Sequence, residues 1–251
     1  MSRITSALTT LPLLSLALLG CASAPPPVPT YVPRFTFSYP QGESPASDIT
    51  IAIVKPMDVA SLPAGATAAA PSTKRARNEA AFKDGIVAQL QDLFSKKGFK
   101  QTGPFDDLNT MTFVDKKGSD LTLTTQLGIS LYVPEMTPVL EQGFGDQVMG
   151  TGVQILQSRG KCGSSGSISF VILEPLSGEK MWIKKIDLAP AEVECSGKGT
   201  HENFTVIDNG VAQLLEMAFQ QTMKKAWDYL SPEEMTILKR QSQELRAKKV
   251  Y

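Results

Sequence analysis

The stretch "SISFVILEPLSGEKMWIKKIDL", residues 167–188, constrains the fold most because it has the pattern of a β-hairpin. An apolar strand runs up to Leu173, turn-forming residues occupy 175–178, and a returning strand alternates around Trp182. A hairpin needs a sheet or a helix layer to cover its apolar face. The chain must therefore build at least one partly antiparallel sheet with other elements packed on it.

The first residues indicate export. Arg3 supplies a positive charge, and Leu11–Leu19 form an apolar core that is too short to span a membrane. Leu18-Leu19-Gly20-Cys21 has the pattern of a bacterial lipobox. We therefore expect residues 1–20 to be a signal peptide and Cys21 to be lipidated on its sulfur. Several acyl chains on one residue make attachment to a bilayer effectively permanent.

Residues 21–33 are then predicted to be a lipidated, proline-rich tether. Prolines favour an extended conformation of about 3.1 Å per residue, which suits a spacer. Ala22 follows the lipidated cysteine, and no aspartate stands there to favour retention in the inner membrane. We expect a location at the outer membrane, in a leaflet that this pattern leaves open.

The remaining cysteines, Cys162 and Cys195, flank the hairpin. In an exported protein such a pair most simply forms a disulfide, which would join the open end of the hairpin. Closing this loop would destabilise the unfolded chain by roughly 3 to 4 kcal/mol. A metal site is the alternative, but His201 is the only histidine and no CxxC spacing occurs.

Residues 34–251 are predicted to form one α+β domain: a mostly antiparallel sheet, helices packed on one face, and a C-terminal helical extension. Aromatic alternation predicts a strand over 35–39, and the region from Glu135 to Gly166 has little period and reads as a long irregular excursion. The other expected elements are strands at 48–56, 99–102 and 120–134, a helix ending at Gly98, a short helix from Asp107 to about Lys116, a helix from Val206, and a helix from Pro232 capped by Ser231.

No residue pattern supports catalysis, a cofactor or a metal, and we expect a protein that is not an enzyme. Basic and acidic residues number 25 each, which gives no electrostatic case for nucleic acid. His201 is expected in a surface loop, and the glycines of 143–155 do not match a phosphate-binding loop. The candidates for contact with sugars or partners are aromatic residues, each of which could equally belong to the core: Tyr132, Phe144, Trp182 and Trp227.

Several segments, in order and spacing, resemble the neuraminyllactose-binding hemagglutinin family, the flagellar-sheath adhesin lipoproteins of helicobacters. They are the lipobox, the aromatic strand, "DITIAIVKP", "LFSKKGFK", "ILEPLSGE" and "QELRAKK". The resemblance implies a lipid-anchored outer-membrane protein that binds sialylated glycans and coats a flagellar sheath or cell surface.

The family's basic run after the long strand has no counterpart here, because "PEMTPVLEQ" contains two glutamates and no basic residue. A sialate carboxylate needs an arginine or backbone donors. No ligand-binding residue is therefore assigned from the resemblance. The first hypothesis is an adhesin or surface-binding lipoprotein, and the alternative is a structural component of an outer-membrane or sheath assembly, bound to envelope proteins rather than glycans.

Replacing the lipidation site tests the anchor. Cys21→Ser removes the only sulfur at the cleavage boundary, so the exported protein should move from the membrane fraction to the soluble fraction. Fractionation of cells followed by immunoblotting measures this, with metabolic labelling by a fatty acid as a second readout. A Cys21→Ser protein that stays in the membrane fraction would contradict the lipoprotein prediction.

Overall fold

The computed structural model describes residues 28–40, 45–58, 73–134, 136–141, 153–198 and 200–249. Its strands are β1 Thr50–Val54, β2 Met57–Asp58, β3 Lys100–Phe105, β4 Leu121–Tyr132, β5 Met136–Glu141, β6 Val153–Ser158, β7 Lys161–Leu173, β8 Lys180–Glu194 and β9 Gly197–Lys198. Its helices are α1 Thr73–Lys96, α2 Phe113–Gly118, α4 Thr200–Tyr229 and α5 Pro232–Lys248. The α+β prediction is confirmed.

The larger sheet is mixed rather than mostly antiparallel. Its strand order is β3-β1-β4-β7-β8, with β2 also paired to β4. β1 runs parallel to both β3 and β4, whereas β4, β7 and β8 are antiparallel neighbours. Because α1 carries the chain back between β1 and β3, those two strands enter the sheet in the same direction. A smaller sheet has the order β5-β6-β9.

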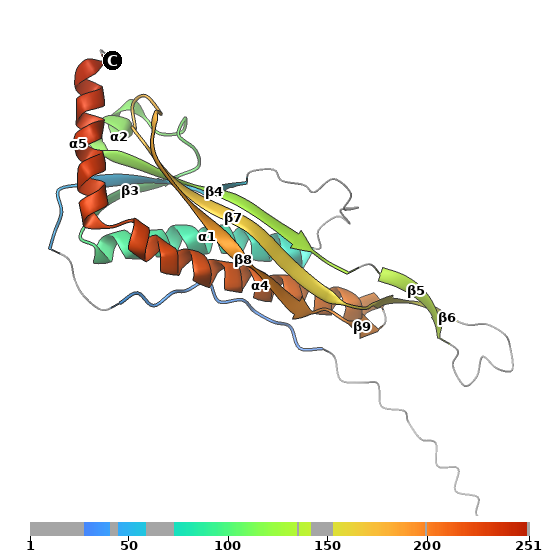
Figure 1. The fold of residues 1–251 in the computed structure, drawn as a ribbon. Coiled ribbons are helices and arrows are strands. Elements are labelled where there is room, and N and C mark those ends of the chain that lie inside the picture. The colour runs from blue at the N-terminus through green and yellow to red at the C-terminus, as the bar shows by residue number, and fades with distance from the viewer. Residues whose placement is uncertain are drawn as a thin grey trace, which may run out of the picture.

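Helices α1 and α4 cover one face of the larger sheet (Figure 1). Apolar residues recur on one side of each helix at the spacing the sequence predicts, and they meet alternate residues of the strands. Gly98 has a φ of 79° and ends α1 as expected, with Lys97 just before it. The core at this interface includes Ile51, Ile53, Phe82, Ile86, Leu90, Leu121, Leu123, Ile168, Phe170, Leu214 and Phe219.

The predicted hairpin is confirmed and is longer than expected, because β7 and β8 stay paired from Lys161–Glu194 to Leu173–Lys180. Cys162 and Cys195 form the predicted disulfide at its open end, with a Cα–Cα distance of 5.6 Å. Both cysteines are fully buried. Helix α4 crosses directly over the bridge at Gly210, where any Cβ atom would collide with the sulfur of Cys195.

The aromatic segment 35–39 is extended, as predicted, but it joins no sheet. The prediction of a β-strand here is therefore wrong. Residues 28–40 instead form a strap that lies against α1 and α4 on the side away from the sheet (Figure 1). Helix side chains bind its backbone: Gln89 accepts from the Phe37 amide at 3.1 Å, and Gln220 donates to the Thr36 carbonyl at 2.9 Å. Alternate strap residues are exposed, which explains the period of two.

Phe35 packs the strap against both helices. Its ring lies 5.6 Å from that of Phe82 and 5.5 Å from that of Phe219, so it fills the groove between α1 and α4. A Cβ atom built on Gly85 of α1 would come within 2.5 Å of the Phe35 Cβ. Glycine costs about 1 kcal/mol relative to alanine inside a helix. Here it permits the strap to rest on the helix backbone.

Three further predictions need correction. Asp107 does not begin a helix; its carboxylate accepts from the amides of Asn109 and Thr110 in a turn, and α2 begins after Thr112. The region 135–166 contains β5, β6 and the start of β7 rather than an irregular excursion, although 142–152 lie outside the described residues. Helix α4 begins at Thr200, which puts His201 in its first turn rather than in a loop.

The predicted C-terminal helix is confirmed. The Ser231 side chain accepts from the Glu234 amide, and Pro232 occupies the first turn of α5. Met235 and Leu238 are buried in the main core, while most of the helix surface is exposed. Within the described ranges, no helix combines the length and apolar character needed to cross a bilayer.

Gly85→Ala should destabilise the protein despite the better helix propensity of alanine. We expect a loss of about 1 to 3 kcal/mol, because the new methyl group overpacks against Phe35. Chemical denaturation followed by circular dichroism measures it. The matched control is Gly85→Ala in a Phe35→Gly background, where the collision is gone and the same change should be neutral or stabilising. Equal losses in both backgrounds would contradict the contact.

Candidate interaction surface

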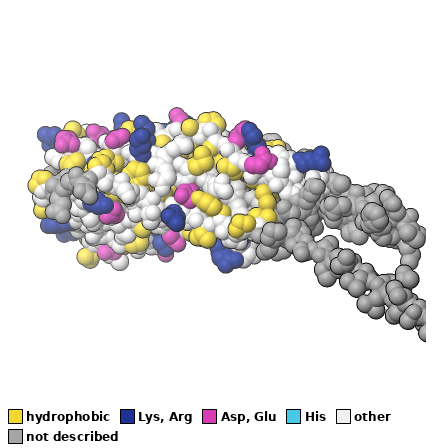
Figure 2. All heavy atoms as spheres, turned by 90° about the horizontal axis from the view of Figure 1, so that it is seen from below, with side chains coloured by type: hydrophobic (Ala, Val, Ile, Leu, Met, Phe, Trp, Pro, Cys, Tyr) yellow, Lys and Arg dark blue, Asp and Glu magenta, His cyan; other side chains and the backbone are white. Residues whose placement is uncertain are grey.

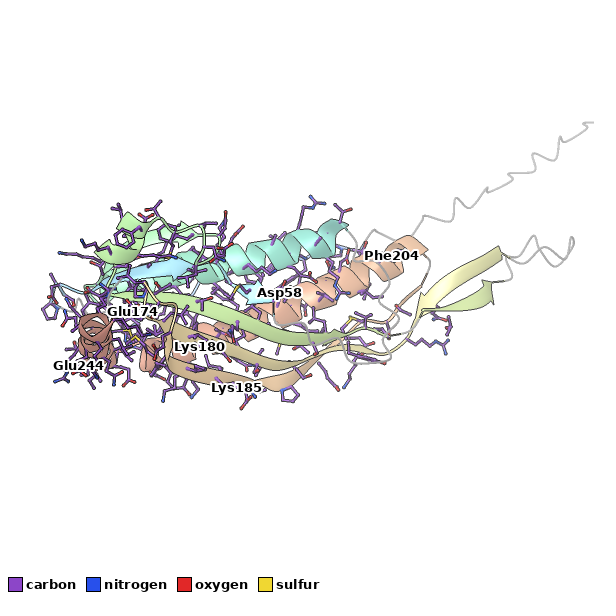
Figure 3. The ribbon with its side chains drawn as sticks, turned by 90° about the horizontal axis from the view of Figure 1, so that it is seen from above. Asp58, Glu174, Lys180, Lys185, Phe204 and Glu244 are labelled. Atoms are coloured by element: carbon purple, nitrogen blue, oxygen red, sulfur yellow. A yellow bond between two sulfur atoms is a disulfide. The ribbon has the colours of Figure 1, made fainter. Side chains whose placement is uncertain are left out.

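Between Gln126 and Tyr132, the face of β4, β7 and β8 that points away from the helices is polar, whereas nearer the hairpin turn the same face carries Val171 and Ile183. Cross-strand register places Gln126, Ser169 and Lys185 in one row of this face, and it places Gly128, Ser167 and Asp187 in the next. Further described positions on it are Ser130, Ser165, Tyr132, Gly163 and Glu192. We call this set the polar sheet face; its side chains are mostly small, and all are exposed or half-buried. Figure 3 shows Lys185 on β8 at this face.

Tyr132 is the most prominent aromatic residue of the polar sheet face, because 66% of it is exposed. Its cross-strand neighbour is Gly163, which has no side chain to cover the ring, and the next residue in that row is Glu192. A bare aromatic ring beside small polar groups can stack on the apolar face of a sugar while serines and carboxylates bind its hydroxyl groups.

The charged side chains near Tyr132 are of both signs. Lys161 contacts Glu192 at 3.0 Å, and Glu194 is the cross-strand partner of Lys161. The hydrogen bond and the charge of Glu192 raise the pKa of Lys161. Arg159 is exposed and precedes Gly160, which lies beside Pro134, so two basic residues stand against two acidic ones. The small polar side chains around the ring suit a hydroxyl-rich ligand.

The sequence alone did not identify this cluster. Tyr132 is one of the four candidate aromatics, but no local sequence pattern points to Lys161, Glu192 and Glu194. They come together only through the β7–β8 register, which shifts between Ser164 and Gly166. The alternating charges near the end of β8 were the available signal. Without the position of the bulge, they could not be assigned to one face.

Trp227 and Trp182, two of the other candidate aromatics, have structural roles. Trp227 stacks on Tyr39 at 5.1 Å between ring centroids, and the Lys97 amine lies 4.4 Å from its ring. That amine also donates to the Trp227 carbonyl near the end of α4 at 2.6 Å, and burial lowers its pKa. Trp182 is half-buried against the core. Phe144 lies outside the described residues.

A shallow groove of about 240 Å³ lies between β8 and α5. Its lining is balanced in charge and has an apolar component: Glu179, Lys180, Met181, Gln241, Glu244, Leu245 and Lys248. Figure 3 shows Lys180 and Glu244 at this end of the molecule, where α5 passes the hairpin. No group of three or more His, Cys, Asp or Glu residues suited to a metal occurs in the described part of the chain.

Beside the groove, two motifs that carried the family resemblance bind each other. Glu174 of "ILEPLSGE" is fully buried and accepts from Arg246 of "QELRAKK" at 2.8 Å. Arg246 also donates to the Ser119 carbonyl at 2.7 Å. Burial opposes ionisation of Glu174, but hydrogen bonds from the Ser177 amide and from Arg246 outweigh it and hold the pKa of this carboxyl below its usual range. This ion pair fastens α5 to the hairpin.

The fold is similar to a solved one. A Helicobacter pylori protein, a homolog of neuraminyllactose-binding hemagglutinin, matches with a TM-score of 0.58 and 15% identity, over 84% of this chain and 98% of that one. A Xanthomonas campestris protein of the DUF330 family matches with a TM-score of 0.29 and 10% identity, over 80% of this chain and 98% of that one. No family model and no curated protein matches the sequence. The first likeness shows a shared fold.

Arg246→Met should cost about 3 kcal/mol, because it leaves the buried Glu174 carboxylate without its charged partner. Lys249→Met is the matched control: it breaks the exposed 2.6 Å pair with Glu179 and should cost under about 1 kcal/mol.

The same ion pair should make stability depend on pH. Because the folded pKa of Glu174 is lowered, its contribution to the free energy of unfolding is present above about pH 4.3 and is lost as the pH falls through the folded pKa. Denaturation at neutral and acidic pH measures both effects; equal losses in the two variants would contradict this assignment.

Proposed function

We propose that the protein is an outer-membrane lipoprotein, anchored through Cys21, that acts by binding rather than catalysis. The anchor rests on the Leu18-Leu19-Gly20-Cys21 pattern, since residues 1–27 lie outside the described structure. The fold shared with the hemagglutinin homolog is consistent with a surface-binding role. Hydroxyl-rich glycans are the proposed ligand class.

The observation that carries this proposal is the exposed Tyr132 ring beside Gly163, on a sheet face made of small polar side chains. The strand order leaves this face of β4, β7 and β8 on the side away from α1 and α4. A flat surface of hydroxyl groups with one aromatic platform suits a sugar. The absence of a basic residue from "PEMTPVLEQ" is the reason to expect weak binding of sialylated glycans.

Tyr132→Ala should lower affinity for the best glycan found on an array at least about fivefold, since loss of a stacked ring removes about 1 to 3 kcal/mol. The protein used is the soluble chain from Ala22, and the melting temperature is the stability control. Phe113→Ala, which truncates a 62% exposed ring on α2 outside the polar sheet face, is the matched variant and should bind normally. No glycan bound by the parent protein, or equal losses in both variants, would refute the site.

A second candidate is a structural role in an envelope assembly, favoured by the exposed surface of α5 and the groove beside it. Deleting residues 232–251 is a poor test of this role, because Met235 and Leu238 belong to the core. Reversing two exposed charges, Arg240→Glu with Lys248→Glu, leaves the core intact. Loss of co-purifying envelope proteins in this variant, with glycan binding kept, would favour the structural role.

A further inference from the structure

The described chain begins at a fixed place on the domain. Asn209 of α4 donates to the Pro29 carbonyl at 2.8 Å and accepts from the Tyr31 amide at 2.9 Å. The Tyr31 hydroxyl donates at 2.6 Å to Glu216, which lies about two turns after Asn209 on α4. Residues 29–33 of the predicted tether are therefore part of the strap. The remaining link contains the six residues between Cys21 and Val28, which is seven Cα–Cα steps.

That place lies in the half of the molecule from which β5 and β6 project (Figure 1). Gly210, next to Asn209, packs on the Cys162–Cys195 bridge, and the exposed Phe204 lies in the same half of α4 (Figure 3). We call this the disulfide end. The opposite end holds the hairpin turn, α2 and the last turns of α5, joined by the bond from Arg246 to Ser119 (Figure 1). We call it the turn end.

Two lengths decide which end can meet the lipid. Seven Cα–Cα steps from Cys21 to Val28 span at most about 25 Å when fully extended. The α4 segment from Asn209 to Tyr229 alone covers about 30 Å, at about 1.5 Å per residue. With the strap docked, the turn end cannot rest on the surface that holds the acyl chains, because Val28 would then stand farther from that surface than the link can reach.

The charge distribution gives no reason for the domain to lie flat. The strap side of the molecule carries acidic and basic side chains interspersed with apolar ones (Figure 2). Basic and acidic residues are equal in number over the whole chain. Attraction to an anionic lipid surface requires a cluster of basic residues, each contributing about 1 kcal/mol. The orientation of the domain relative to the membrane is therefore set by the strap and its short link rather than by electrostatic attraction to lipids.

We infer that the lipid surface meets the disulfide end of the domain, and that the strap fixes this orientation and points the turn end, with its groove between β8 and α5, away from the membrane. This inference rests on the proposed anchoring at Cys21. It assigns the bilayer to the disulfide end, where Tyr132 also lies because its partner Gly163 is next to Cys162, and it leaves the groove at the turn end open to molecules beyond the bilayer. A sugar bound at Tyr132 would then be held close to the lipid headgroups.

Two exposed phenylalanines form a matched pair of probes. Phe204 is 42% exposed at the disulfide end, and Phe113 is 62% exposed at the turn end. Full-length lipidated Phe204→Cys and Phe113→Cys proteins are each labelled with one donor dye, after mass spectrometry confirms the native disulfide. They are then inserted in vesicles of phosphatidylcholine and phosphatidylglycerol that carry an acceptor dye on the lipid headgroups.

Energy transfer to the headgroups should be several-fold more efficient from position 204 than from position 113. Inserting about 20 glycine and serine residues after Ala24 adds about 25 Å of flexible reach and should largely remove this difference. Equal or reversed transfer in the protein with its natural link would overturn the orientation while leaving the anchor intact. Failure of the unsubstituted protein to associate with vesicles would refute the anchor itself, and the orientation with it.

Discussion

The contact between Phe35 and the backbone of α1 at Gly85 is the constraint on which the outer layer of the structure depends. Helices α1 and α4 bury one side against the sheet, and the groove between them needs a second cover. An aromatic side chain fills that groove only if one helix presents bare backbone, because a single methyl group at position 85 would occupy the space of the Phe35 Cβ. The domain is thus built in three layers: sheet, helix pair and strap.

The strap also shows why the sequence predicted its conformation but not its partner. Alternation of aromatic and small residues over 35–39 predicts an extended backbone with one buried side, and the structure confirms this. It carries no information about what binds the backbone amides. Those partners are amide and carboxylate side chains such as Gln89 and Glu216, which are separated from the strap by 52 and 182 or more residues. Local patterns with local causes were predictable: the hairpin, the cap at Ser231 and the glycine after α1.

The candidate site was predictable only in part, for the same reason. The Cys162–Cys195 bridge follows from the cysteine count and the hairpin between them. The exposed position of Tyr132 depends on which face of β4 the helices cover, and its charged neighbours depend on a bulge in β8. Glu174 and Arg246 are the opposite case: "ILEPLSGE" and "QELRAKK" carry the family resemblance, and these two side chains hold α5 on the hairpin.

The strap has a consequence for the order in which the protein becomes native. Tyr31 forms hydrogen bonds with Asn209 and Glu216 across sequence separations of 178 and 185 residues. The strap, which is synthesised first, can therefore dock only after α4 has been synthesised. Contacts of such high contact order close late and slowly. An exported chain would emerge with its N-terminal segment still unattached, and that segment would lock into its groove only after α4 had followed. The final step of folding would then be the docking of the strap, and this step would fix the orientation of the domain relative to its N-terminal segment.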